Sequence, residues 1–279
     1  MTNLEDELGD IAAKARKGLA ITVAQLATST GLNTGEIESM EAYKFTPGRE
    51  QVKKVAEALS LSPDKLADIS ADAYSPAAVS PRQAPALVEV VPVPMGAYAE
   101  NSYVLGCAQT KLAAVIDPGG AVDVISERLA ANGLTLAVIL ITHAHSDHIG
   151  GLKQLVAAWP SVRLVNSLVE RDSITRGVKA EWEVAQDGIR QSLGNLSITP
   201  LSTPGHTPGS MCYLVDGVCF VGDTLFAGSI GRPSGHEIFQ QMLAQIRAKV
   251  LSLPETTILF PGHGPATTVA EEKAHNPFF

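Results

Sequence analysis

The sequence predicts a large α/β domain preceded by a small all-α domain and an extended linker. Over residues 87–279, apolar strand-like runs alternate with amphipathic helical stretches, which is typical of α/β proteins. Residues 1–70 instead show helical periodicity and helix-capping sequences throughout. Between them, residues 71–86 place prolines among small side chains without apolar periodicity, and this composition indicates a linker.

Five short helices are predicted within residues 1–70. Capping-box spacing, which lets two side chains bond each other's backbone N–H groups, marks helix starts at Thr22 and Asn33, and Gly31 can end the earlier one. The fourth helix is Arg49–Leu59, and the fifth begins at Ser62-Pro63. The first helix has an apolar face made by Leu4, Leu8, Ile11, Ala12 and Ala15.

The larger domain is predicted to contain paired sheets that helices can cover on both faces. Its predicted helices are Val122–Ala131, Gly150–Trp159 and Phe239–Leu253. Its predicted strands are Leu87–Val93, Ser102–Cys107, Lys111–Ile116, Leu136–Ile141, Leu196–Leu201, Met211–Val215, Val218–Val221 and Thr257–Phe260.

Composition argues against several classes of protein. No apolar run approaches the roughly 20 residues needed to cross a bilayer, so we expect no membrane association. The acidic start lacks the pattern of a signal peptide, and the three cysteines have no metal-type spacing and are expected to be small buried thiols. We therefore expect a cytoplasmic protein. A net charge of −8 gives no general attraction for nucleic acid or anionic membranes.

A histidine-rich run directly follows the predicted strand Leu136–Ile141. It contains His143, His145, Asp147 and His148. Burying neutral imidazoles and a carboxylate at the end of a strand costs free energy unless something binds them, and a divalent metal ion usually does so. Side chains two apart in an extended chain point the same way, so the first two histidines can hold one ion. The other two residues fall where a helix starts and can point toward a second ion.

Three further strands end in a residue with metal-binding chemistry. Leu196–Leu201 leads to His206, Val218–Val221 to Asp223 and Thr257–Phe260 to His263. Each residue alone could be an ordinary turn or cap. Ligands in α/β proteins gather at the carboxyl ends of strands, so four strand ends that carry such residues predict one shared metal site.

The motifs at these positions resemble those of the metallo-β-lactamase fold superfamily. They read T-H-A-H-S-D-H, P-G-H-T-P-G-S, G-D-T-L-F-A-G-S-I-G-R and P-G-H-G-P, in the family's order, and the resemblance covers nearly all of residues 87–279. Within the superfamily the chain looks most like glyoxalase II, a hydroxyacylglutathione hydrolase, in its short bacterial form. Asn101-Ser102-Tyr103 and Asp117-Pro118-Gly119-Gly120 carry this closer resemblance. It implies a four-layer αββα sandwich with metals at one edge.

The resemblance also implies two divalent metal ions, with zinc expected first and iron or manganese as alternatives. His143, His145 and His206 would hold one ion, Asp147, His148 and His263 the other, and Asp223 would bridge both. Asp117 would orient a ligand histidine from behind. Asp147 and Asp223 would be the catalytic carboxylates, and a hydroxide shared by the ions would attack the carbonyl of a small-molecule thioester such as S-2-hydroxyacylglutathione.

Other activities remain open for the same residues. A single iron held by His143, His206 and Asp223 would suit a persulfide dioxygenase, and the hydroxide could also open a lactone. A regulator that binds DNA in response to a metabolite is a further alternative. The chain ends at Phe279, where longer glyoxalase II enzymes continue into a helical domain that binds glutathione, so we expect an open pocket.

The N-terminal segment resembles the lambda-repressor/Cro-like helix-turn-helix family over residues 21–66. The resemblance implies that the third predicted helix lies in the major groove of DNA. Charge opposes this use, because residues 1–75 hold eight Lys and Arg against twelve Asp and Glu. Lys14, Arg16 and Lys17 nevertheless form a basic cluster that could contact a DNA backbone. We expect a protein contact or dimerisation in preference to DNA binding, and a homo-oligomer remains open.

Overall fold

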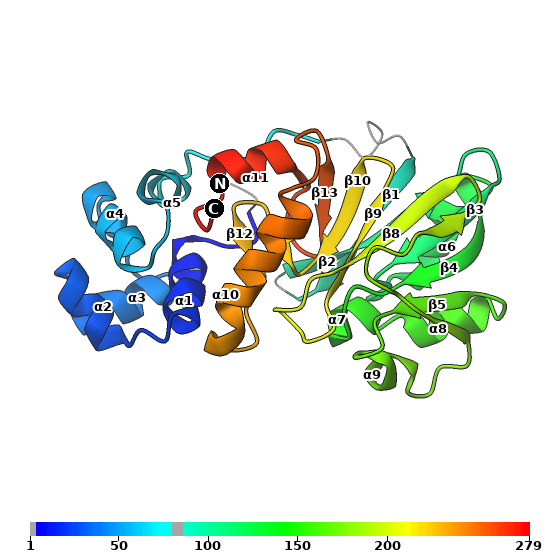
Figure 1. Cartoon of the computed structure of the whole chain (residues 1–279), viewed down its shortest axis with the longest axis horizontal. Coiled ribbons are helices and arrows are strands. Elements are labelled where there is room, and N and C mark those ends of the chain that lie inside the picture. The colour runs from blue at the N-terminus through cyan, green and yellow to red at the C-terminus, as the bar shows by residue number, and fades with distance from the viewer. Residues whose placement is uncertain (1–3, 80–85, 97) are drawn as a thin grey trace.

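The computed structural model describes residues 4–79, 86–96 and 98–279, so residues 80–85 of the expected linker lie outside the described residues (Figure 1). Two six-stranded sheets pack face to face, and helices cover the outer face of each sheet. This four-layer αββα arrangement confirms the predicted fold class.

The first sheet has the strand order β1-β2-β3-β4-β5-β6, antiparallel as far as β3 and parallel beyond it. Its strands are β1 (Leu87–Met95), β2 (Tyr98–Gly106), β3 (Leu112–Ile116), β4 (Thr135–Leu140), β5 (Arg163–Asn166) and β6 (Glu181–Val184).

The second sheet has the order β14-β13-β10-β9-β8-β7. Because β8 and β10 are both antiparallel to β9, and β13 is parallel to β10, the strands β8, β10 and β13 point the same way. The strands are β7 (Gln191–Leu193), β8 (Leu196–Ser202), β9 (Met211–Val215), β10 (Val218–Gly222), β13 (Ile258–Pro261) and β14 (Thr267–Thr268). A separate hairpin of β11 (Leu225–Phe226) and β12 (Ser229–Ile230) follows β10.

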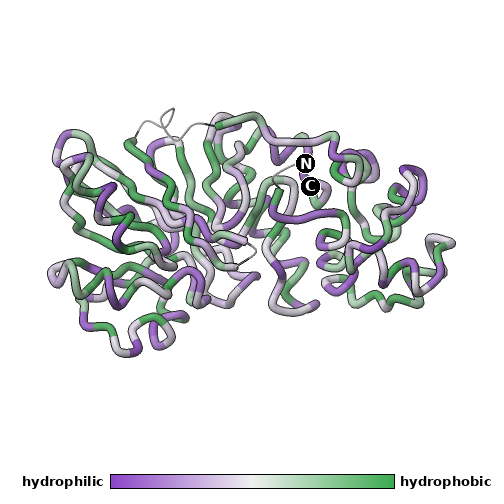
Figure 2. Tube along the Cα trace, turned by 180° about the vertical axis from the view of Figure 1, so that it is seen from behind, coloured by the Kyte–Doolittle hydropathy of each residue, from purple (hydrophilic) through white to green (hydrophobic). Residues whose placement is uncertain are grey.

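Apolar side chains fill three layers. Between the sheets, the rings of Tyr103, Phe220 and Phe260 pack at centroid distances of 5.2, 5.3 and 5.4 Å. Helices α6 (Val122–Ala131) and α8 (Leu152–Ala158) cover the first sheet. Helices α10 (His236–Gln245) and α11 (Val269–His275) cover the second sheet. Figure 2 shows hydrophobic stretches along the strands, as expected for sheets buried on both faces.

Five N-terminal helices pack beside α10 (Figure 1). They are α1 (Leu8–Gly18), α2 (Val23–Thr30), α3 (Thr34–Glu41), α4 (Arg49–Ala58) and α5 (Pro63–Ser70). The two expected capping boxes are present at Thr22 and Asn33, and Gly31 ends α2 in the left-handed conformation with φ +75°. The buried side chains of these helices join those of α10 and the second sheet in one continuous core.

Some element boundaries differ from the prediction. The helix expected over Gly150–Trp159 is α8, which begins two residues later at Leu152, and a separate short helix, α7 (Ser146–Ile149), lies before Gly150 and Gly151. The last long helix begins at His236 and continues after Gln245 as a π-helical turn, Ile246–Val250. Strands β5 and β6 and helix α9 (Arg171–Thr175) were not predicted, since runs of four or five residues carry little periodicity.

The expected basic cluster on the first helix is wrong, because two of its three side chains have partners within the protein. Lys14 is buried and forms an ion pair with Asp6. Arg16 forms a forked pair with Glu41, with N–O distances of 2.5 and 2.7 Å. Only Lys17 of the three is exposed. The helix therefore offers far less positive charge to a DNA backbone than the sequence suggested.

Two expectations from composition can be compared with the described residues. All three cysteines are buried free thiols. None of the helices in the described ranges combines the length and apolar character needed to cross a bilayer.

Candidate metal centre

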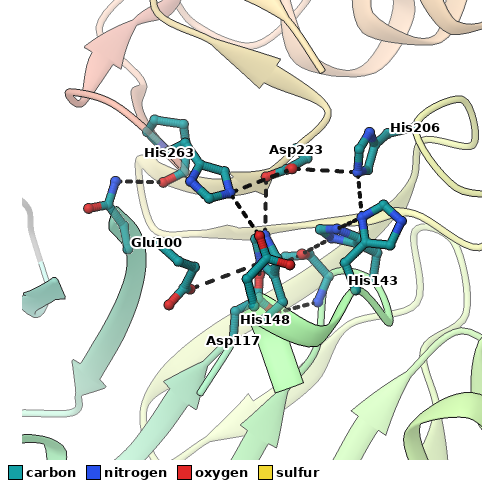
Figure 3. A network of polar contacts seen from close by, with 12 residues as sticks. Glu100, Asp117, His143, His148, His206, Asp223 and His263 are labelled. Atoms are coloured by element: carbon teal, nitrogen blue, oxygen red, sulfur yellow. Dashed lines mark hydrogen bonds and ion pairs between the residues drawn. The ribbon is translucent and has the colours of Figure 1, made fainter. Parts of the chain in front are cut away.

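Strands β4, β8, β10 and β13 bring the predicted ligands to one edge of the sandwich. The first sheet contributes the run after β4, and the second sheet contributes the residues after the three strands that share a direction. Figure 3 shows several of these side chains pointing toward a common centre. All seven sequence-predicted ligands meet there: His143, His145, Asp147, His148, His206, Asp223 and His263.

The first group of ligand atoms contains three histidines and Asp223. His145 Nδ1 lies 3.0 Å from His143 Nε2 and 2.9 Å from His206 Nε2. His206 Nε2 lies 3.5 Å from Asp223 Oδ2. One ligand atom from each of these four residues falls within 4.8 Å of all the others, a spacing that suits a single ion.

The second group lies beside the first and contains Asp147, His148 and His263. His263 Nε2 is 3.4 Å from Asp147 Oδ2, and His148 Nε2 is 3.3 Å from Asp223 Oδ1. Asp223 Oδ2 also lies 3.8 Å from His263 Nε2. The carboxylate of Asp223 therefore stands between the two groups, with an oxygen facing each.

Acceptors behind the rings fix which histidine nitrogen faces the centre. His148 Nδ1 lies 2.9 Å from Asp117 Oδ2, as predicted for Asp117. His206 Nδ1 lies 2.9 Å from the Arg232 carbonyl, and His263 Nδ1 lies 2.9 Å from the Ala99 carbonyl. A ring that donates its Nδ1–H to such an acceptor leaves the Nε2 lone pair free for a metal.

Two glycines allow the backbone to approach the ligands closely. A Cβ atom on Gly119 would lie 1.6 Å from the Asp147 carbonyl oxygen. A Cβ atom on Gly262 would lie 2.4 Å from Asp223 Oδ1 and 2.5 Å from His148 Cε1. Side chains at these positions would displace the ligands themselves, so the glycines in the D-P-G-G and P-G-H-G motifs have a steric role.

Electrostatics favour the metal-binding protonation state of His143 and Asp223, but not of every ligand. Burial lowers the pKa of His143, and the neighbouring His148 lowers it further. Burial opposes ionisation of Asp223, but the rings of His148 and His143 outweigh it and hold the pKa of that carboxyl far below its usual value. Neutral imidazoles and an ionised carboxylate are the forms that bind a metal. At His148 and His263, burial alone would lower the pKa of the ring, but the carboxylates of Asp223 and Asp147, respectively, outweigh it and raise the pKa.

Buried polar atoms without partners indicate that these side chains fit divalent metal ions. Among the described residues, His148 Nε2 and Asp223 Oδ1 are buried without any hydrogen-bond partner. A buried polar atom without a partner costs free energy, and a cation shared by these nitrogen and oxygen donors would remove that cost. Imidazole and carboxylate donors suit zinc, iron and manganese.

Sequence reasoning missed Glu100, which lies behind the second group. Its side chain is fully buried, and its carboxyl oxygen is 4.0 Å from His148 Nδ1 (Figure 3). Burial raises the pKa of Glu100 to about 10, with a further contribution from Asp117, so the group is a neutral acid at neutral pH. The available signal was a glutamate directly before Asn101-Ser102-Tyr103, where the polar start of strand β2 leads into an apolar run.

A cavity of about 500 Å³ opens over the ligands. His145, Asp147, His206, Asp223 and His263 line its floor, and Tyr98, Phe226 and Arg232 line its side. The opposite side comes from the N-terminal segment: Glu5, Asp6, Asp10, Lys14 and Tyr43. The N-terminal segment therefore lines the pocket, a role that its sequence does not predict.

An αββα sandwich with two groups of histidine and aspartate ligands at one edge defines a metal-binding protein of hydrolase type. Residues 95–263 match the Metallo-beta-lactamase superfamily, which is more than half of the chain. The chain belongs to this superfamily.

Similar proteins cover about two thirds of the chain. A hydroxyacylglutathione hydrolase, GloC, of Haemophilus influenzae is 35% identical over 211 residues, which are 68% of this chain and 97% of that protein. The crystal structure of TTHA1623 in a di-iron-bound form is 30% identical, covers 68% of this chain and 100% of its own, and has a TM-score of 0.56. ETHE1 from Myxococcus xanthus is 28% identical over 68% of this chain and 83% of its own, with a TM-score of 0.56.

Proposed function

We propose that the protein is a metal-dependent hydrolase of thioesters such as S-2-hydroxyacylglutathione. The observation that carries the proposal is the position of Asp223 between two complete groups of ligands, on the floor of a cavity large enough for a small molecule. The similarity to a hydroxyacylglutathione hydrolase supports the substrate class.

The ligand roles follow from the two groups. His143, His145 and His206 would hold one ion, Asp147, His148 and His263 a second, and Asp223 would contact both. When bound, two such ions lower the pKa of water toward neutrality and stabilise the oxyanion that forms when a thioester carbonyl is attacked.

Other side chains at the site would bind water, exclude bulk solvent and orient the ligands. Contact with the His263 ring, whose Nε2 lies 3.4 Å from Asp147 Oδ2, lowers the pKa of Asp147, so this half-buried carboxylate stays ionised and can accept a hydrogen bond from water in the cavity. Tyr98 and Phe226 bring aromatic surface to the same cavity, where they can pack against an acyl group and exclude bulk water. Asp117, through His148, keeps the second group in place.

Asp223→Ala should abolish metal binding and thioester hydrolysis together, because both ligand groups lose their shared carboxylate. The test is metal content per chain, together with the hydrolysis of S-lactoylglutathione, simple thioesters and lactones. Asp172→Ala, at an exposed position on α9, is the matched control and should keep both properties. Hydrolysis retained by Asp223→Ala would contradict the mechanism, and lactones preferred over all thioesters would contradict the substrate class.

A second candidate is an iron-dependent persulfide dioxygenase, which the similarity to ETHE1 favours. His143, His206 and Asp223 lie in one group and would form its two-histidine, one-carboxylate triad. The second group supports hydrolysis instead, since Asp147, His148 and His263 form a further set of ligands. One iron per chain, with oxygen uptake in the presence of glutathione persulfide, would establish the dioxygenase and exclude the hydrolase.

A further inference from the structure

Helix α1 forms a fixed wall of the metal cavity. Lys14 Nζ donates a hydrogen bond to the Ile230 carbonyl at 2.7 Å and lies 5.0 Å from the centre of the Phe226 ring. At the end of the same helix, a Cβ atom on Gly18 would lie 2.4 Å from the Phe239 ring, so the two helices α1 and α10 are in close contact. Helix α1 is therefore held at its middle and at its C-terminal end by the part of the chain that carries the metal ligands.

A second cavity of about 250 Å³ lies beside the first along α1. Asp10, Lys14 and Arg232 line both cavities, so the two are neighbours. The Arg232 carbonyl lies 2.9 Å from His206 Nδ1, which places this arginine directly beside a metal ligand. The second cavity extends away from the metals toward Lys17, Pro233, Gly235 and His236.

The two cavities differ in charge. The cavity over the metal ligands is lined by the carboxylates of Glu5, Asp147 and Asp223. Of the charged residues that line the second cavity, Lys14 is paired with Asp6, and Asp10 is an acidic group that accepts a hydrogen bond from the Tyr43 hydroxyl.

Lys17 and Arg232 line the second cavity as exposed cations. Neither side chain has an ion-pair partner among the residues that the structure describes. An anionic group on a molecule whose reacting end sits at the metals therefore meets free positive charge in the second cavity.

We propose that the second cavity binds an anionic group of the thiol that leaves in the reaction, through Lys17 and Arg232. The thiol carrier then lies along α1 while its acyl group lies over the metal ligands. The anion is a carboxylate, as on glutathione, or a phosphate, as on coenzyme A, and a guanidinium can bind either through two parallel hydrogen bonds. This inference rests on the proposed thioester hydrolysis for the direction in which the substrate lies.

The first test measures binding rather than turnover. Glutathione and coenzyme A are titrated calorimetrically into the full-length, metal-loaded protein, its Lys17→Glu and Arg232→Gln variants, and a Lys54→Glu control on the exposed side of α4. Either substitution in the cavity should weaken binding of the preferred thiol about tenfold, whereas the control should bind as the unmodified protein does. Tighter binding of glutathione assigns a carboxylate, and tighter binding of coenzyme A assigns a phosphate.

The second test compares substrates. For Lys17→Glu, the ratio of kcat/KM for the preferred anionic thioester to kcat/KM for an uncharged N-acetylcysteamine thioester should fall about tenfold. An unchanged ratio together with unchanged thiol binding would overturn the proposal. Lys17-dependent thiol binding by a protein that hydrolyses no thioester would instead overturn the proposed function and leave the anion site standing.

Discussion

Asp117 connects the backbone of the histidine run to the second group of ligands. Its Oδ1 accepts the Thr142 N–H at 2.7 Å, and its Oδ2 accepts the Thr142 hydroxyl at 2.6 Å and lies 2.9 Å from His148 Nδ1. A carboxylate in this position both orients the imidazole and makes its other nitrogen a stronger ligand.

Asp117→Asn should lower metal affinity about 10- to 100-fold, because an amide cannot accept all of these hydrogen bonds without a donor facing a donor. Activity should be lost at limiting metal and should return as metal is added in excess. Titration with zinc, followed by activity and bound metal, measures the shift. Activity that stays absent at saturating metal would show that Asp117 acts in some way other than supporting a ligand.

The candidate ligands and the support Asp117 could be predicted from the sequence, but the other supports could not. Each of His206, Asp223 and His263 follows a strand-like run, and strand ends have a predictable place in an α/β fold. The acceptors behind two of the rings are the backbone carbonyls of Ala99 and Arg232. Every residue has a carbonyl, so no side-chain pattern marks these acceptors.

At the scale of elements, the contact between α1 and α10 depends on the missing side chain of Gly18. Gly18→Ala should lower the free energy of unfolding by about 1–3 kcal/mol, since its Cβ would collide with the Phe239 ring. Gly35→Ala is the matched control, because Gly35 lies on the exposed face of α3 and should be neutral or stabilising by up to about 1 kcal/mol. Urea denaturation of both variants distinguishes a packing effect from a general preference for alanine in helices.

Elements with a clear apolar run or helical periodicity could be predicted to within a few residues, and elements that depend on tertiary contacts could not. The strand Met211–Val215 and helix Val122–Ala131 have the predicted bounds. Helix α7 has four residues, and its start at Ser146 is fixed by the turn that places Asp147 and His148 toward the second group. Tertiary contacts decide such an element, so its periodicity carries no usable signal.

At the scale of the whole molecule, one buried carboxyl connects stability to pH. Glu272 on α11 is fully buried, where it accepts hydrogen bonds from Thr267 Oγ1 and Asn276 Nδ2 at 2.8 Å and from Gly228 N at 3.1 Å. Burial raises the pKa of Glu272 to about 7. The folded protein therefore holds this proton more tightly than an unfolded chain, in which a glutamate has a pKa of about 4.3.

The contribution of Glu272 to the free energy of unfolding should be fully present below the pKa that this group has in the unfolded chain. It should be lost as the pH rises through about 7. We expect the free energy of unfolding to fall by about 3 kcal/mol from this group between pH 4.5 and 8. Urea denaturation across that range should show a shallower slope for Glu272→Gln than for the unmodified protein. Other titrating groups cancel in the comparison, and identical slopes would contradict the assignment.

How the helical segment packs against the sandwich could not be predicted from the sequence. The five helices were predicted, and their separation from residues 87–279 by a linker remains a prediction. Contacts such as the Ser62 N–H to the Pro277 carbonyl, at 2.8 Å, join positions more than 200 residues apart. No periodicity reveals which surface a helix will cover, so the wall that α1 adds to the cavity could be found only in three dimensions.

Helices α1–α5 share a continuous apolar core with α10. The helical segment is therefore packed firmly against the sandwich and is not a separate domain on a flexible tether. A partner bound to the outer side of α2–α4 would lie at a fixed angle and distance from the mouth of the cavity, because no hinge separates the helical segment from the sandwich within that core. Small molecules released by such a partner would then diffuse over one fixed distance to the mouth. A flexible tether would instead only raise their local concentration.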